Sequence, residues 1–357
     1  MIFTAVAVAT AVVVTANLTL VAPADTVTEH RSVGSAISSD ETDSEPHRGK
    51  RIDQAVQIAL GAPMWLARWA AFVSLFLLIG AVAFKYLILQ RTSSAPRDSD
   101  VFHQIASSGA ATAGMFSAIV LVVATVMKLY GETEVMRGVS LGTILAETGW
   151  GQAWLLQMIA CVVAVGAFAA AHRKNNFAWP VAAACALILS ATPAITGHAI
   201  SSDEALIAVP VDIAHVLAGS IWLGTLAIIL IVGIGGAVKA PDTDSVGEKI
   251  ATLVNAFSPI ALVCGAIVVA SGVATSLMHI SPLSRLWRTT YGMTLVVKLA
   301  LVSLLFTLGA WNWRRVRPNL GGDEGVQALR FSAKLELTAS VLVLAVTAFL
   351  VALPLPD

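Results

Sequence analysis

Four residues in the second half of the chain combine metal-binding side chains with positions inside or at the ends of long apolar runs. They are His198, His215, Met278 and His279. Imidazole is a ligand for several transition metals, and a thioether adds a preference for Cu(I). A single histidine in an apolar run is more often a hydrogen-bonded packing residue, whereas three histidines from different runs, all toward one side, make a metal site as good an interpretation as packing.

Charged residues lie inside the same apolar runs. Asp212 precedes His215 by three positions, which places both on one face of a helix, and Trp222 continues that face seven residues on. Lys298 has a depth in its own run similar to that of Asp212, so an ion pair between them would offset the cost of burying each charge. Arg68 lies about one turn inside the outer boundary of its run. The alternative is that Lys298 and Arg68 extend their charged ends to the lipid headgroups.

The elements that must position these residues are membrane helices. Of the 357 residues, 57% are hydrophobic and 12% are charged, about half the charged fraction of a soluble protein, and the mean hydropathy is +0.81. Apolar runs of about 20 residues can cross a bilayer as helices, and none here alternates as a barrel strand does. The nine runs cover residues 3–22, 64–89, 104–128, 151–171, 178–199, 206–236, 252–277, 292–313 and 333–353. The sequence therefore predicts an all-α, polytopic transmembrane helix bundle and excludes a disordered protein.

The first run differs in kind from the other eight. It ends in Ala22-Pro23-Ala24, a small-x-small pattern typical of a signal-peptidase site, although no Lys or Arg precedes it. Residues 1–24 are therefore predicted to be a signal peptide or a retained anchor helix. Residues 25–62 are expected to form a polar extracytoplasmic segment, and residues 63–355 an eight-helix membrane domain.

Loop charges predict how this domain is oriented. The loops after its first, third, fifth and seventh helices hold more Lys and Arg residues than the alternate loops do. The alternate loops carry acidic residues such as Glu132, with the exception of Arg285 and Arg288 after the sixth helix. By the positive-inside rule the first set of loops is cytoplasmic. Residues 25–62 and the carboxyl terminus then lie outside a plasma membrane of bacterial type.

The two halves of the membrane domain share a faint repeat. Thr148-Gly149-Trp150-Gly151 opens the third helix, and Thr289-Thr290-Tyr291-Gly292 opens the seventh, 141 residues later. Gly80 in the first helix matches Gly224 in the fifth at a similar spacing. A spacing of four helices preserves orientation, as a parallel duplication would.

Motifs for other chemistries are missing from the sequence. It has no P-loop, no dinucleotide-binding glycine motif, no HExxH and no GxSxG, so it is not an ATP-driven pump and no catalytic residue is predicted. Basic and acidic residues number 22 each, which leaves no basic surplus for nucleic acid.

The three cysteines lie within apolar runs and form no CxxC; they are Cys161, Cys185 and Cys264. Cys161 with Met115 and Met158 is either a set of soft contacts for Cu(I) or core filler.

Four motifs give the chain a family resemblance. They are Gly197-His198-Ala199, the segment His215–Gly224 (HVLAGSIWLG), Thr290-Tyr291-Gly292 followed by Lys298-Leu299-Ala300 with Asn312 and Arg314-Arg315 beyond, and Glu336 with Pro354 in the last helix. In this order and spacing they resemble the CopD family of bacterial copper-resistance and copper-uptake membrane proteins. The resemblance covers about residues 60–355.

The resemblance implies an eight-helix inner-membrane protein that moves copper ions, as Cu(I) or Cu(II), from the outer side toward the cytoplasm. It assigns copper binding to His198 and His215, while Met278 and His279 are added from their position alone. The supporting intramembrane polar residues are Asp212, Lys298, Arg68, Trp222 and Glu336. Some relatives carry a fused periplasmic copper-binding β-domain, for which residues 25–62 are too short. A separate periplasmic copper chaperone is therefore an expected partner, beside the lipid bilayer.

A membrane redox protein is the alternative from a different class. Two histidines on neighbouring helices can ligate haem as well as copper. Two stacked haems would need histidine pairs near both membrane faces, and the inner half has only His103 and His172 at its edge. This pattern disfavours transmembrane electron transfer and leaves a single outer haem as the alternative.

Overall fold

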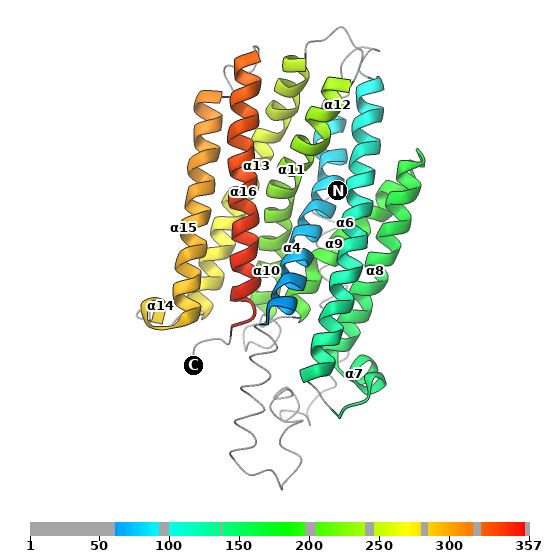
Figure 1. Ribbon diagram of the computed structural model, residues 1–357, viewed down its shortest axis with the longest axis vertical. Coiled ribbons are helices and arrows are strands. Elements are labelled where there is room, and N and C mark those ends of the chain that lie inside the picture. Colours follow the sequence, from blue (N-terminus) through cyan, green and yellow to red (C-terminus); the bar gives the residue numbers. More distant parts are fainter. Residues whose placement is uncertain are drawn as a thin grey trace.

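The predicted bundle of eight membrane helices is confirmed. The computed structural model describes residues 61–92, 100–135, 138–196, 205–239, 246–279, 285–316 and 323–353, which are helical with short turns and contain no strand. Eight helical segments in these ranges are long and apolar enough to cross a membrane (Figure 1). The predicted signal or anchor at residues 1–24 and nearly all of the polar segment at residues 25–62 lie outside the described residues.

Several of the spans combine α-helical with π-helical segments. In chain order the elements are α4 (Ala62–Ala83), η1 (Phe84–Leu89) and α5 (Gln90–Thr92); α6 (Asp100–Val135); α7 (Leu141–Glu147); α8 (Gly149–His172); α9 (Ala178–Thr196); α10 (Ala205–Gly219), η3 (Ser220–Gly224), α11 (Thr225–Ile228), η4 (Ile229–Gly233) and α12 (Ile234–Lys239); α13 (Val246–His279); α14 (Arg285–Arg288); α15 (Thr290–Trp311) and η5 (Asn312–Val316); and α16 (Asp323–Leu350). The short helices α7 and α14 are the two elements of this series that stand apart from the eight spans.

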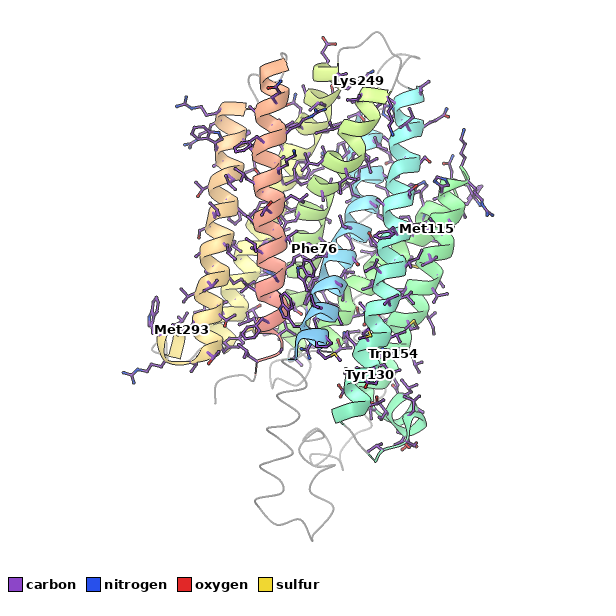
Figure 2. The ribbon with its side chains drawn as sticks, in the orientation of Figure 1. Phe76, Met115, Tyr130, Trp154, Lys249 and Met293 are labelled. Atoms are coloured by element: carbon purple, nitrogen blue, oxygen red, sulfur yellow. The ribbon has the colours of Figure 1, made fainter. Side chains whose placement is uncertain are left out.

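The first and fifth spans cross at two glycines in the centre of the bundle. A Cβ added to Gly80 of α4 would lie 2.2 Å from the carbonyl carbon of Gly224 in η3, and one added to Gly224 would lie 1.9 Å from the carbonyl oxygen of Phe76. Small residues allow such close approach of helix backbones in a membrane. Phe76 lies near the middle of the bundle in Figure 2, which marks the crossing.

The remaining spans pack around this crossing. α4 contacts α6 and α9, α6 packs on α8, and α8 packs on α9. In the second half α10 packs on α13 and α9, and α15 packs on α16, which returns to α4. Figure 1 shows α4 between α6 and α8 on one side and α15 and α16 on the other.

The faint sequence repeat corresponds to repeated structure. The Thr148 hydroxyl oxygen accepts a 2.9 Å hydrogen bond from the backbone N–H of Gly151, and that of Thr289 accepts one of 3.0 Å from Gly292. Each threonine therefore caps the helix that follows it, α8 or α15. A short helix precedes each cap, α7 in the first half and α14 in the second, and both lie at the same end of the bundle (Figure 1).

Candidate metal-handling site

His215 of α10 is a half-buried imidazole that α13 holds in place. Its Nδ1 lies 2.9 Å from Oγ of Ser271. The Ser271 hydroxyl has two backbone acceptors on its own helix, the carbonyl of Ile267 at 2.6 Å and that of Val268 at 3.3 Å, and while it donates to either it accepts from the ring. Nδ1 therefore carries the proton, and Nε2 keeps a lone pair that a metal ion can use.

α13 also shapes the space around the ring. A Cβ added to Gly272 would lie 3.5 Å from Cε1 of His215, and the carbonyl of Val268 hydrogen-bonds the imidazole. That carbonyl lies 3.3 Å from Oγ of Ser271, hence on the Nδ1 side of the ring. Sequence reasoning missed Ser271; its signal was a glycine beside two hydroxyl residues one helical turn apart, Ser271 and Thr275.

Two opposite charges lie near this histidine. Asp212 is one turn before His215 on α10, and Lys298 is on α15; both are half-buried. Lys298 is close enough to Asp212 for their charges to attract each other, and close enough to act on His215. The charges thus lie within the span segments, where an opposite charge offsets part of the cost of burial.

The other predicted ligands lie at or beyond helix ends. Met278 is half-buried and follows Ser271 by seven residues, two turns or about 10 Å farther along α13. His279 is the last residue of α13, and its side chain lies outside the described part of the chain, as does His198, two residues after α9 ends at Thr196. Among the described side chains, no three of His, Cys, Asp or Glu gather closely enough to hold a metal ion.

Trp222 is a packing residue two helical turns beyond His215 in the fifth span. It is buried in η3, and its ring centroid lies 5.0 Å from that of Phe306 on α15. A Cβ added to Gly265 of α13 would lie 4.0 Å from the same indole. Trp222 therefore joins three spans two helical turns from His215, farther from the α14 end.

Arg68 interacts with charged groups on another helix of the first half. On α4 it is close enough to Glu132 for attraction, and it repels Lys128, both on α6. Glu132 lies in a helix and not in the loop predicted from the sequence, because α6 continues to Val135. A charged pair interrupts the apolar run there, so hydropathy alone ends the helix too early.

Glu336 belongs to a second polar contact, between α15 and α16. Only 7% of Glu336 is exposed, and its Oε1 accepts a short hydrogen bond from Nδ2 of Asn312, the first residue of η5. Oδ1 of Asn312 is buried without a hydrogen-bond partner among the described residues. This contact lies at the end of α15 opposite the α14 end, away from His215.

Comparison with known proteins places these features in a family. Residues 59–209 match the family model described as copper resistance protein D-like, N-terminal domain, and residues 251–350 match the model for copper resistance protein D. The first model covers α4 to α9, and the second covers nearly all of α13 to α16. No solved structure matches the chain.

Two characterised relatives are similar along much of the chain. The copper transport protein CutJ of Bacillus subtilis (strain 168) is 27% identical over 216 residues, which is 59% of this chain and 38% of CutJ. Copper resistance protein D of Pseudomonas syringae pv. tomato is 26% identical over 294 residues, 79% of this chain and 94% of that protein. The chain thus spans well under half of CutJ and nearly all of the second relative. With both halves of its bundle matched, the chain belongs to the copper resistance protein D family of multi-pass membrane proteins.

Proposed function

We propose that this protein carries copper ions across the membrane, from the outer side toward the cytoplasm, and that His215 is the residue on which transport depends. The observation that supports this most directly is the hydrogen bond from Nδ1 of His215 to Ser271. It leaves Nε2 as an unprotonated ligand inside a span, and imidazole is a common copper ligand. CutJ and copper resistance protein D, the relatives named above, carry copper in their names.

A stepwise path fits the spacing along α13 and α10. Met278 lies about 10 Å from Ser271 along α13, too far to share one ion with His215. We infer that Met278 meets copper first, together with His279, the last residue of α13, and His198, which follows α9 in the sequence, and passes it inward to His215. Asp212 and Lys298 would set the charge at that second position. Weak, successive contacts suit transport because an ion must leave each one.

The direction of transport depends on the orientation of the bundle. We infer that the end carrying α7 and α14 is outside, because Arg91, Arg173 and Lys174 lie at the opposite end and basic loops stay in the cytoplasm. Alkaline phosphatase fused after Glu147 should be active, and the same enzyme fused after Arg173 should be inactive. The reverse pattern would overturn the orientation and, with it, the direction of transport.

The test of the function is copper accumulation in cells that express the chain. Cells with the wild-type protein should gain copper above the vector control when copper is supplied, measured by plasma mass spectrometry. His215→Ala should return cell copper to the vector level, since Nε2 is lost. The matched control is His172→Ala, because His172 contacts Ser108 and Thr112 at the opposite end of the bundle. Equal accumulation by His215→Ala, at equal membrane abundance, would contradict the proposal.

A further inference from the structure

Two cysteines of the first half lie at nearly the same depth in the bundle, on neighbouring helices. Cys161 of α8 and Cys185 of α9 are both buried, and neither is in a disulfide. The antiparallel helices are aligned by Phe168 and Trp179, whose ring centroids lie 5.9 Å apart. Cys161 lies seven residues before Phe168, and Cys185 six residues after Trp179, so the two thiols have nearly the same depth. They are close enough for a charge on one to act on the other.

A buried polar network surrounds these thiols. Gln157, one turn before Cys161 on the same face of α8, donates from Nε2 to Oγ1 of Thr125 at 3.1 Å. The Thr125 hydroxyl donates to the carbonyl of Leu121 at 2.7 Å and also hydrogen-bonds Cys161. Nε1 of Trp154 donates to the Thr125 carbonyl at 2.8 Å. Trp154 lies on α8 toward the end that carries α7 (Figure 2).

This network leaves one oxygen without a donor. Only 5% of Gln157 is exposed, and its Oε1 has no hydrogen-bond partner in the part of the chain that the structure describes. Such atoms are rare in folded proteins, because burial removes the water that would otherwise satisfy them. The partial negative charge of this oxygen would attract a positive ion at Cys161, one helical turn away.

A cation of the protein lies close enough to the same thiol for its charge to act on it. The charge of Lys128, on α6, acts on Cys161, and farther toward the end of α6 Lys128 is followed by Glu132 and faces Arg68 of α4. Charged groups thus extend from the end of α6 to the buried thiols. A negatively charged complex at the cysteines would have Lys128 as its counter-charge.

We propose that Cys161 and Cys185 bind one Cu(I) ion between α8 and α9, in a two-thiolate site separate from His215. Thiolates select Cu(I) among the available metal ions, and a coordinated thiol loses its proton. Binding releases two protons and transfers no electron, so the complex has one negative charge, which Lys128 balances. The unpaired oxygen of Gln157 adds a partial negative charge one turn from the ion.

The site has a counterpart in the architecture of the second half. Gln157 follows the Thr148 cap by nine residues, and Lys298 follows the Thr289 cap by nine. Each half therefore holds a polar group at one depth of its third helix, beside thiols in one half and an imidazole in the other. The proposal does not depend on the role of His215, and it extends copper handling to the first half.

Titration of the purified full-length chain with Cu(I) tests the site. The protein is kept reduced and anaerobic in detergent, and Cu(I) is supplied as its complex with the coloured chelator bathocuproine disulfonate. Wild-type protein should remove one Cu(I) per chain from the chelator. X-ray absorption at the copper edge should show sulfur ligands around this copper. Cys161→Ser and Cys185→Ser should each weaken this binding at least tenfold.

Matched variants separate this site from other copper and from damage to the fold. Cys264→Ser removes a third buried cysteine, on α13, and should keep the sulfur-ligated copper, as should His215→Ala. Each variant must elute as wild type in size exclusion, and Cys161→Ala replaces the serine variant if that one aggregates. Absence of sulfur-ligated copper from wild type, or its retention in both cysteine variants, would overturn the proposal. That result would leave the proposed copper uptake through His215 unaffected.

Discussion

Ser271 decides the chemistry that His215 can perform. The serine donates to its own helix at Ile267 and accepts from Nδ1 of His215, so the tautomer with a free Nε2 is favoured. Hydrogen-bond partners of this kind orient metal-binding histidines in proteins. The sequence places Asp212 on the same face of α10 as His215, but the observed partner of Nδ1 is Ser271, on another helix.

Removing the Ser271 hydroxyl should weaken copper transport without stopping it. In Ser271→Ala the ring keeps its ligand nitrogen but loses the contact that sets its tautomer and orientation. Loss of such a partner costs about 10- to 100-fold in metal affinity. The copper concentration for half-maximal uptake by cells should rise by a factor of that order.

A hydroxyl at the same position should restore uptake. Ser271→Thr keeps the acceptor oxygen and adds one methyl group, so the half-maximal concentration should stay near that of wild type. If Ser271→Ala and Ser271→Thr behave alike, the hydrogen bond has no part in transport, and Ser271 is only a packing residue.

Sequence reasoning could find His215 but not Ser271. A histidine, a lysine and an aspartate are conspicuous in apolar runs, because each carries a cost at membrane depth. Serine is ordinary in a membrane helix, since its hydroxyl can bond to its own backbone one turn back. Only the register of α10 against α13 shows that the same oxygen also meets the imidazole.

At the scale of elements, the crossing of the first and fifth spans positions the rest of the bundle. η3 begins at Ser220, five residues after His215, and ends at Gly224, which contacts the backbone of α4. The position of α10 along α13 is therefore tied to the crossing at Gly80 and Gly224. Hydropathy predicted all eight spans, but it could not show that the repeated glycines Gly80 and Gly224 touch, or that the first and fifth spans contain π-helical segments.

Filling this crossing should destabilise the protein. Gly224→Val would place Cβ 1.9 Å from the Phe76 carbonyl oxygen, so the helices must separate. Overpacking of this kind costs about 1–3 kcal/mol, and the Tm of the protein in detergent should fall, as followed by size exclusion after heating.

A glycine with open space supplies the control for that change. Nothing lies within 4 Å of a Cβ added to Gly166 of α8, so Gly166→Ala should leave the Tm unchanged or raise it slightly through its better helix propensity. A Tm for Gly224→Val equal to that of wild type would show that the two spans are free to move apart, contrary to the close crossing.

At the scale of the whole molecule, the bundle consists of two four-span halves of similar construction. Each has a capped third span preceded by a short helix, and the halves meet at equivalent glycines. The halves differ twelve residues before these glycines. Arg68 precedes Gly80 in the first half, and Asp212 precedes Gly224 in the second. A duplicated scaffold with different polar residues explains how one fold could hold an imidazole site and a thiol site.

The limits of sequence prediction at this scale have a physical cause. Threonine caps and short helices are local, so the repeat was detectable from Thr148 and Thr289. The partners of buried charges depend on distant helices, and so neither the attraction between Arg68 and Glu132 nor the hydrogen bond between Glu336 and Asn312 was predicted. Burial of each charge requires such a partner, but only the packing of the spans identifies it.

Copper flux into liposomes that contain only the purified protein measures transport without any other cell component. The vesicles enclose a fluorescent copper indicator, and Cu(I) is added outside. Copper should enter vesicles with wild-type protein faster than protein-free vesicles, and His215→Ala should give the protein-free rate. Wild-type flux no faster than in empty liposomes, or equal flux with His215→Ala, would contradict copper transport through His215.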